Sequence, residues 1–123
     1  MSRTNHNFRK LKVWEEAIDL VVEIYKEAAK YPKEEKYGII SQIQRAGVSI
    51  PSNIAEGSAR GTNPDFIRFL YISKGSIAEV ITLLSVAVKL EITNQESVDV
   101  IIEKLIQIDN SIFKLINTLD RKS

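Results

Sequence analysis

The C-terminal part of the sequence carries the most regular apolar pattern in the chain. Its aliphatic residues alternate steps of three and four through Val98, Ile101, Leu105, Ile108, Ile112, Leu115 and Leu119. This spacing is typical of a helix packed along other helices in a bundle. A second row widens the apolar stripe to the breadth of a helix with more than one neighbour, and it consists of Ile102, Ile106, Phe113 and Ile116. A capping box, Thr93-Asn-Gln-Glu96, begins this predicted helix, which ends near Leu119.

Two further helices are predicted in the N-terminal half of the chain. The first covers about residues 13–30, and its apolar residues at steps of four and three are Trp14, Ile18, Val21, Tyr25 and Ala28. Pro32 follows it, and the residue before a proline disfavours helix. The second helix is predicted from about Glu35 to Gly57, with a bend at Pro51 because proline removes one backbone hydrogen bond.

The remaining helix is predicted from Asn63 to about Leu90, with Asn63 as N-cap and Pro64 at the first helical position. No segment shows the alternation typical of a strand. Since the loops between the helices are short, the predicted fold is all-α, an antiparallel up-and-down four-helix bundle. Residues 13–120 are predicted to form this single domain, and residues 1–12 to form a mobile basic arm.

The helix over residues 63–90 is apolar almost all round near its end. From Val80 to Leu90 only Thr82, Ser85 and Lys89 form a polar line. A helix with so narrow a wet face is expected to be covered by a second partner, which indicates self-association. Two candidate residues for that interface are Ile81 and Val88. A membrane span is disfavoured, because the run between Glu79 and Lys89 is shorter than the ~20 residues that a bilayer requires.

A second stripe, polar in character, lies on the predicted helix that ends at Gly57. Its members repeat at steps of three and four and are Gln42, Arg45, Ser49, Asn53 and Glu56. Amides and hydroxyls in such a row indicate specific hydrogen bonds, to another helix, another subunit or a ligand. If this helix and the next form a hairpin about the loop 58–62, residues whose numbers sum to about 121 stand level. This register places Asn53 opposite Arg68 and Gln42 opposite Glu79, which favours an inter-helix hydrogen-bond network.

Two glycines fall in mid-helix, where each costs about 1 kcal/mol relative to alanine. The same hairpin register places Gly47 beside Gly75. We predict that both allow close contact between helices, a more common role for such glycines than a hinge or ligand site.

The residues that catalysis would require are scarce. The chain has no Cys, and its single histidine, His6, falls in the predicted arm. There is no Glu-x-x-His pair for a di-iron site and no phosphate-binding glycine loop. Glu56 and Glu79 are expected to form structural ion pairs rather than an acid–base pair. The prediction is therefore a protein that is not an enzyme, has no cofactor or metal, and resides in the cytoplasm, since no secretory signal is present.

Nucleic-acid binding receives little support from the net charge of +1. The residues that could contact phosphates are Arg3, Arg9, Lys10, Lys12, Arg60, Arg68 and Lys74. These charges are interleaved with sixteen acidic residues, so a purely solvating role is the alternative. In an oligomer, repetition would multiply weak sites into useful avidity.

Several motifs occur together along the first three predicted helices. They begin with Phe8-x-x-Leu11-x-Val13-Trp14 and Ala17, continue through Tyr31-Pro32-x-Glu34, Tyr37 and Gln42-x-x-Arg45-Ala46-x-x-Ser49-Ile50-Pro51-x-Asn53-Ile54-Ala55-Glu56-Gly57, and end with Arg60, Phe66-x-x-Phe69-Leu70 and Gly75-Ser76-x-x-Glu79. Together they resemble a known family, the four-helix bundle proteins named for intervening sequences in bacterial 23S ribosomal RNA genes. The resemblance implies a left-handed up-and-down bundle that assembles as a homopentamer without known catalysis.

A relative with a similar bundle is the accessory protein of diversity-generating retroelements, which is strongly basic and binds nucleic acid and a reverse transcriptase. This chain departs from that relative in its net charge. The resulting hypothesis is a non-catalytic oligomeric interaction or scaffold protein that contacts itself and an unknown protein partner. The alternative is an accessory protein that binds RNA or DNA weakly as a pentamer.

Overall fold

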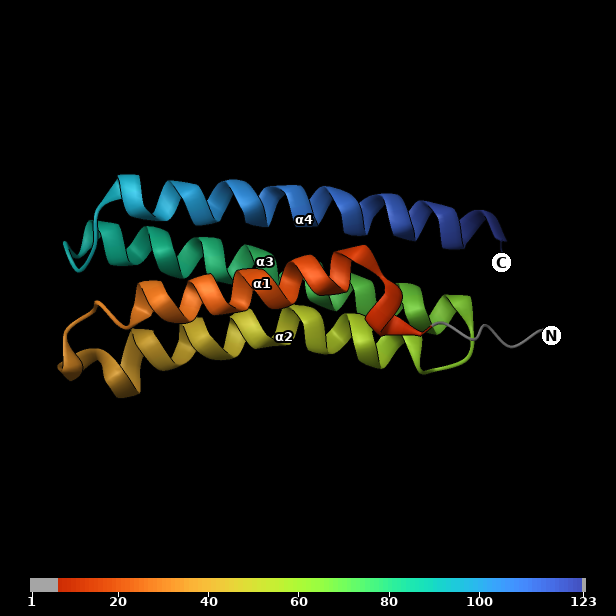
Figure 1. The fold of residues 1–123 in the computed structure, drawn as a ribbon, viewed down its shortest axis with the longest axis horizontal. Coiled ribbons are helices and arrows are strands. Elements are labelled where there is room, and N and C mark those ends of the chain that lie inside the picture. The colour runs from red at the N-terminus through yellow and green to blue at the C-terminus, as the bar shows by residue number, and fades with distance from the viewer. Residues whose placement is uncertain (1–6, 123) are drawn as a thin grey trace.

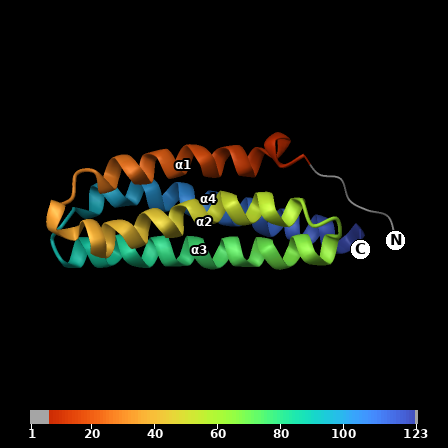
Figure 2. The same cartoon turned by 90° about the horizontal axis from the view of Figure 1, so that it is seen from below.

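The structure, a computed structural model, describes residues 7–122, without the side chains of Lys36 and Tyr37. Its elements are a short 3₁₀ helix η1 (Phe8–Lys10) and four long helices, α1 (Lys12–Ala28), α2 (Ser41–Ser58), α3 (Asn63–Lys89) and α4 (Gln95–Lys122). Successive helices run antiparallel, and α1 also packs on α4, so that α1 lies diagonal to α3 (Figures 1 and 2). No strand occurs in residues 7–122, and the predicted all-α four-helix bundle is confirmed.

The core of the bundle includes the predicted seam of α4 with one exchange. Val98, Ile101, Leu105, Ile108, Ile112 and Leu119 are buried as expected, and Ile116 is buried more deeply than Leu115. In the second row, Ile102 is partly buried against the core. Ile106 and Phe113 are each 49% exposed. The second row therefore leaves apolar surface uncovered in the single chain.

The apolar stripe predicted for the first helix is not the one that faces the core. The buried residues of α1 are Val13, Ala17, Leu20, Ile24, Glu27 and Ala28. Of the predicted stripe only Ala28 is among them, whereas Ile18 and Tyr25 are 37% and 43% exposed. Apolar residues cover so much of this helix that two adjacent rows both have helical spacing, and the spacing alone does not select between them.

The ends of α3 and α4 differ from the predicted caps. Thr62, not Asn63, caps α3, because its hydroxyl accepts a hydrogen bond from the Asp65 backbone N–H at 3.3 Å. Asn63 turns inward and donates its side-chain amide to the Leu119 carbonyl at 3.2 Å. Asn94 caps α4 by accepting from the Ser97 N–H at 2.8 Å. Thr62 and Asn94 thus satisfy backbone donors that a helix start leaves unpaired, whereas Asn63 satisfies a carbonyl near the end of α4.

The second helix begins later than predicted, at Ser41. The preceding residues form a 3₁₀ turn, η2 (Lys33–Glu35), and a wide turn, η3 (Lys36–Ile40), interrupted by Gly38 at φ −111° and ψ −113°. Pro51 lies inside α2, and α2 continues through it to Ser58.

The glycines separate into two kinds of environment. A Cβ atom on Gly57, which lies inside α2 rather than at its end, would stand 2.7 Å from the Cβ of Phe69 in α3. A Cβ on Gly47 would stand 3.2 Å from the Cδ1 of Ile24 in α1. Gly75 is exposed, and a Cβ there would meet nothing within 4 Å. The predicted contact between Gly47 and Gly75 is therefore wrong: Gly47 approaches α1, and Gly75 contacts no neighbouring helix.

Part of the segment predicted as a mobile arm packs on the bundle. Arg3 and His6 lie outside the described residues, but Phe8 begins η1 and packs edge-to-face on Trp14, with ring centroids 5.2 Å apart. The Asn7 side chain caps this turn by accepting from the Arg9 N–H at 3.1 Å. Residues 7–11 are therefore attached to the bundle, and α1 begins at Lys12.

Candidate interaction surfaces

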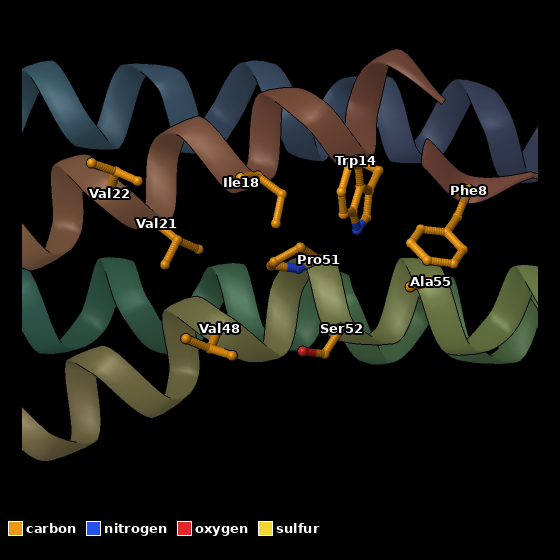
Figure 3. A pocket seen from close by; sticks show the side chains of 9 residues that line it. All are labelled: Phe8, Trp14, Ile18, Val21, Val22, Val48, Pro51, Ser52 and Ala55. Atoms are coloured by element: carbon orange, nitrogen blue, oxygen red, sulfur yellow. The ribbon is translucent and has the colours of Figure 1, made fainter. Parts of the chain in front are cut away.

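A groove lies between α1 and α2 on the outside of the bundle. Its volume is about 350 Å³, and its lining residues are Phe8, Trp14, Ile18, Val21, Val22, Val48, Pro51, Ser52 and Ala55. Figure 3 shows Trp14 and Ile18 projecting from α1 toward α2, with Pro51 facing them and Phe8 above Ala55 at one end. Only Ser52 carries a side-chain hydroxyl here, so the groove offers apolar contact rather than polar chemistry. We call this surface the α1–α2 groove.

The polar stripe of α2 lies at its junction with α3. One bond crosses between the helices within the stripe, from the Ser76 hydroxyl to the Ser49 hydroxyl at 2.8 Å. The Asn53 amide instead donates to the carbonyl and the hydroxyl of Ser49, at 2.8 and 2.9 Å, within α2. The hairpin register predicts bonds from Gln42 to Glu79 and from Asn53 to Arg68. Among the described residues, no hydrogen bond or ion pair joins either pair. The stripe is thus partly a helix contact and partly an exposed surface.

A serine outside the predicted stripe makes a second bond between these helices. The buried Ser73 donates its hydroxyl to the carbonyl of Ile50 at 2.9 Å. At the exposed end of the stripe, Glu56 pairs with Arg60 at 3.4 Å, and both side chains are about half exposed. Arg45 and Gln42 are exposed, and no hydrogen bond or ion pair joins either to another residue in the described part of the chain.

Basic residues gather at one end of the bundle. The guanidinium carbons of Arg60 and Arg68 lie 4.7 and 4.6 Å from the centre of the Phe69 ring. Each guanidinium also faces an acid, Glu56 at 3.4 Å for Arg60 and Asp65 at 3.7 Å for Arg68. The exposed Arg9, Lys10 and Lys12 belong to η1 and the start of α1, which lie at the same end as the α2–α3 turn (Figures 1 and 2). The structure brings these two groups to one end.

Lys74 stands apart from that end. It pairs with Asp109 of α4 at 2.9 Å, lies 5.5 Å from the centre of the Phe113 ring, and is only 23% exposed. Because its charge is balanced by Asp109 and its side chain is mostly covered, Lys74 is a helix-to-helix contact rather than an open phosphate ligand.

The interface candidates of α3 lie on its α4 side. Ile81 and Val88 follow Lys74 by seven and fourteen residues, hence on nearly the same helix face, and both are partly buried against the core. The apolar side chains of α3 that reach solvent are others: Tyr71, Ile72 and Val86 are 53%, 43% and 42% exposed.

Length and composition alone would let α3 cross a membrane, because its most apolar stretch has a mean hydropathy of 1.4. In the bundle this helix packs between α2 and α4. Its row of buried side chains, which includes Phe66, Leu70, Ile77, Val80 and Leu84, faces the core. A helix that is central to a four-helix bundle is apolar for the same reason.

At the opposite end of the bundle, the buried carboxylate of Glu27 connects α1 to the segment that precedes α4. Glu27 is 4% exposed, and it accepts hydrogen bonds from the Tyr31 hydroxyl at 2.9 Å and the Thr93 hydroxyl at 2.6 Å. Lys30 pairs with it at 3.1 Å. Burial alone raises the pKa of Glu27, but the bonds from Thr93, Lys30 and Tyr31 together hold that pKa below its ordinary value. Burial, followed by the Glu27 carboxylate, raises the pKa of Tyr31.

Two of these features were missed by the sequence reasoning. The α1–α2 groove has a signal in the sequence, since Trp14, Ile18 and Val21 belong to the apolar row predicted for the first helix, but helical spacing does not show which neighbour covers that row. The Glu27 cluster carried none, because Thr93 is distant in sequence and had been assigned to a capping box. In the part of the chain that the structure describes, no three metal-binding side chains cluster.

Comparison with known proteins agrees with these observations. A family model described as 23S rRNA-intervening sequence protein matches residues 9–114, which include the groove lining apart from Phe8, the polar stripe and most of α4. The chain belongs to this family. A search of curated proteins finds no match.

A similar crystal structure is that of a protein with unknown function from the S23 ribosomal protein family of Bacteroides thetaiotaomicron VPI-5482. The two proteins are 25% identical with a TM-score of 0.78, over 85% of this chain and 97% of that chain. The similarity to this family inferred from the sequence motifs is therefore confirmed. Neither the family description nor the neighbour's description names a reaction.

Proposed function

We propose that the protein is a non-catalytic interaction or scaffold protein of the cytoplasm that assembles with copies of itself, as a homopentamer. The observation that carries this proposal is the α1–α2 groove, an apolar surface on the outside of a complete bundle. Its exposed members include Ile18, Val22 and Val48, at 37%, 49% and 40%. Contiguous apolar surface of this kind marks interaction sites in proteins.

The polar chemistry of the described residues supports a structural rather than a catalytic role. Glu27 lines a surface hollow with Glu23 and Lys26, but its carboxylate is saturated by three donors, the Tyr31 and Thr93 hydroxyls and the Lys30 ammonium. Glu56 pairs with Arg60 on the surface, and among the described residues its carboxylate has no hydrogen bond from a hydroxyl that could act as a nucleophile. A nucleophile in contact with an oriented base is the usual signature of covalent catalysis.

The oligomeric state tests this proposal directly. Light scattering coupled to size exclusion should give about five times the 13.9 kDa of one chain, independent of concentration over a hundredfold range. A mass of 13.9 kDa at every concentration would contradict the proposal. A discrete mass of two or more chains, other than five, would support self-assembly and correct the number of copies.

Weak nucleic-acid binding is a second candidate, favoured by the basic end of the bundle. Arg60 and Arg68 lie on one aromatic ring, at the same end of the bundle as η1, which contains Arg9 and Lys10. Because Glu56 and Asp65 offset both arginines, we expect sequence-independent binding at low salt that is lost by physiological salt. Fluorescence anisotropy with one RNA and one DNA, across a salt series, measures it. Equal affinity for Arg60→Gln with Arg68→Gln and for the wild type would exclude this end as the site.

A further inference from the structure

The nine side chains that line the α1–α2 groove carry no charge. With 27% charged residues in the chain, about two of nine positions would be charged if the groove were ordinary surface. The nearest charged positions on the same helical rows are Glu15, one heptad before Val22, and Arg45, one heptad before Ser52, so charge borders the groove without entering it. An uncharged groove of this kind is expected to be covered in the working protein.

The opposite face offers a complementary surface. Since α1 is diagonal to α3 in the bundle, the face between α3 and α4 lies across from the groove (Figure 2). Its exposed apolar side chains are Tyr71, Ile106 and Phe113, at 53%, 49% and 49%. Tyr71 precedes Lys74 by three residues and Ile106 precedes Asp109 by three, and the Lys74–Asp109 pair joins the two helices beside the Phe113 ring. We call Tyr71, Ile106 and Phe113 the α3–α4 patch.

Charge does not oppose contact between these two surfaces. The groove lining carries no charge, and the two charges at the centre of the patch, Lys74 and Asp109, neutralise each other at 2.9 Å. A protruding aromatic ring such as Phe113 fits an apolar groove, and aromatic side chains are enriched in the centres of protein interfaces. A groove placed against a second groove would leave both poorly filled.

The size of the face is adequate for a self-contact. A helix of the length of α1, 17 residues, is about 26 Å long at ~1.5 Å per residue. Two helices side by side, each about 10 Å across, give roughly 500 Å² per partner. The pair of faces therefore buries roughly 1,000 Å², the lower bound for a stable interface. In a closed ring each copy contributes both faces, so each chain buries roughly 1,000 Å² in all, about 500 Å² on each face.

We propose that the α1–α2 groove of one copy binds the α3–α4 patch of the next copy, in a head-to-tail contact between two different faces. This proposal rests on the proposed self-assembly and assigns the surfaces that make it. A contact between two different faces generates a ring when it closes. Trp14, Val22 and Val48 then provide the groove side, and Phe113 and Ile106 provide the inserted side.

Charged substitutions at exposed positions test the assignment without disturbing the core. Val22→Glu in the groove and Ile106→Glu in the patch should each reduce the mass from about five chains to one, with unchanged circular dichroism. Val100→Glu is the matched control, because Val100 is 54% exposed and lines a hollow with Glu23 and Lys26 on another side of the bundle. Val100→Glu should keep the wild-type mass.

Mixing the two variants tests the head-to-tail geometry. Val22→Glu retains an intact patch and Ile106→Glu retains an intact groove, so an equimolar mixture should form a pair of mass about twice 13.9 kDa. A mixture that remains single chains would overturn the proposal. If the wild type is an oligomer and Val22→Glu retains its mass, the groove assignment fails while self-assembly stands; a monomeric wild type refutes both.

A cross-linking experiment covers the case in which a charged variant unfolds. The chain contains no Cys, so single cysteines can be placed cleanly. Val48→Cys mixed with Phe113→Cys should give a cross-linked dimer with a short bis-maleimide, whereas Val48→Cys mixed with Val100→Cys should not. Equal yields from the two mixtures would contradict the proposed contact.

Discussion

The contact between α2 and α3 at Gly57 gives the sharpest stability prediction. A methyl group on Gly57 would stand 2.7 Å from the Cβ of Phe69 and 3.2 Å from the carbonyl oxygen of Phe66, whereas ordinary contacts are 3.4–4 Å. Both atoms are fixed to the backbone of α3, so α3 itself would have to move. Alanine gains about 1 kcal/mol of helix propensity, and overpacking costs about 1–3 kcal/mol. Because relief requires a helix shift, we expect Gly57→Ala to lower the free energy of unfolding by about 1–2 kcal/mol.

Gly75→Ala is the matched comparison, since a methyl group there meets nothing within 4 Å. The propensity gain should then be retained in full, raising the free energy of unfolding by about 1 kcal/mol. Urea unfolding followed by circular dichroism, at one fixed protein concentration, measures both variants. The two should differ by about 2–3 kcal/mol. The reasoning is refuted if Gly57→Ala is as stable as the wild type, or if Gly75→Ala is as destabilised as Gly57→Ala.

Three further changes follow from the structure. The folded pKa of Glu27 lies below its ordinary 4.5, so the ionised carboxylate stabilises the folded state above pH 4.5, and this stabilisation is lost as the pH falls through the folded pKa. In urea unfolding, the wild type should have a larger free energy of unfolding than Glu27→Gln at about pH 6, and the difference should shrink toward about pH 3. Glu91 has φ 61° after α3, so Glu91→Gly should raise the thermal midpoint through about 1 kcal/mol of relieved strain, and an unchanged or lower midpoint would argue against strain there. Asn53→Leu should cost about 1 kcal/mol and the exposed Arg45→Met less than about 0.5 kcal/mol in the same unfolding assay, and the reverse order would show that Arg45 has a partner in the oligomer.

The sequence predicted well wherever one face of a helix differed clearly from the others. The α4 seam has a single dominant row, and six of its seven predicted residues are buried. The α1 pattern has two apolar rows side by side, and only the packing of α2 and α4 decided that Leu20 and Ile24 would face inward while Trp14 and Ile18 would line the groove. Periodicity measures spacing and does not identify the neighbour that covers each row.

Glycine roles illustrate the same division. Helix propensity shows that Gly47, Gly57 and Gly75 are costly inside helices. Whether a glycine is required depends on how close an added Cβ atom would come to a neighbouring helix. At Gly57 this atom would stand 2.7 Å from the Cβ of Phe69, and at Gly75 it would meet nothing within 4 Å. That distance is a property of the packed structure.

The sequence by itself determined the four long helices, the apolar face of α4 and the family to which the chain belongs, because these depend on local spacing and on motif residues. Tertiary structure decided which residues are buried, that Thr93 reaches Glu27 across 66 positions, and that an uncharged groove is left uncovered on the outside of a complete bundle. The physical reason is that contacts between distant segments depend on helix rotation and register. Both are fixed only when the four apolar faces pack together and bury the most surface.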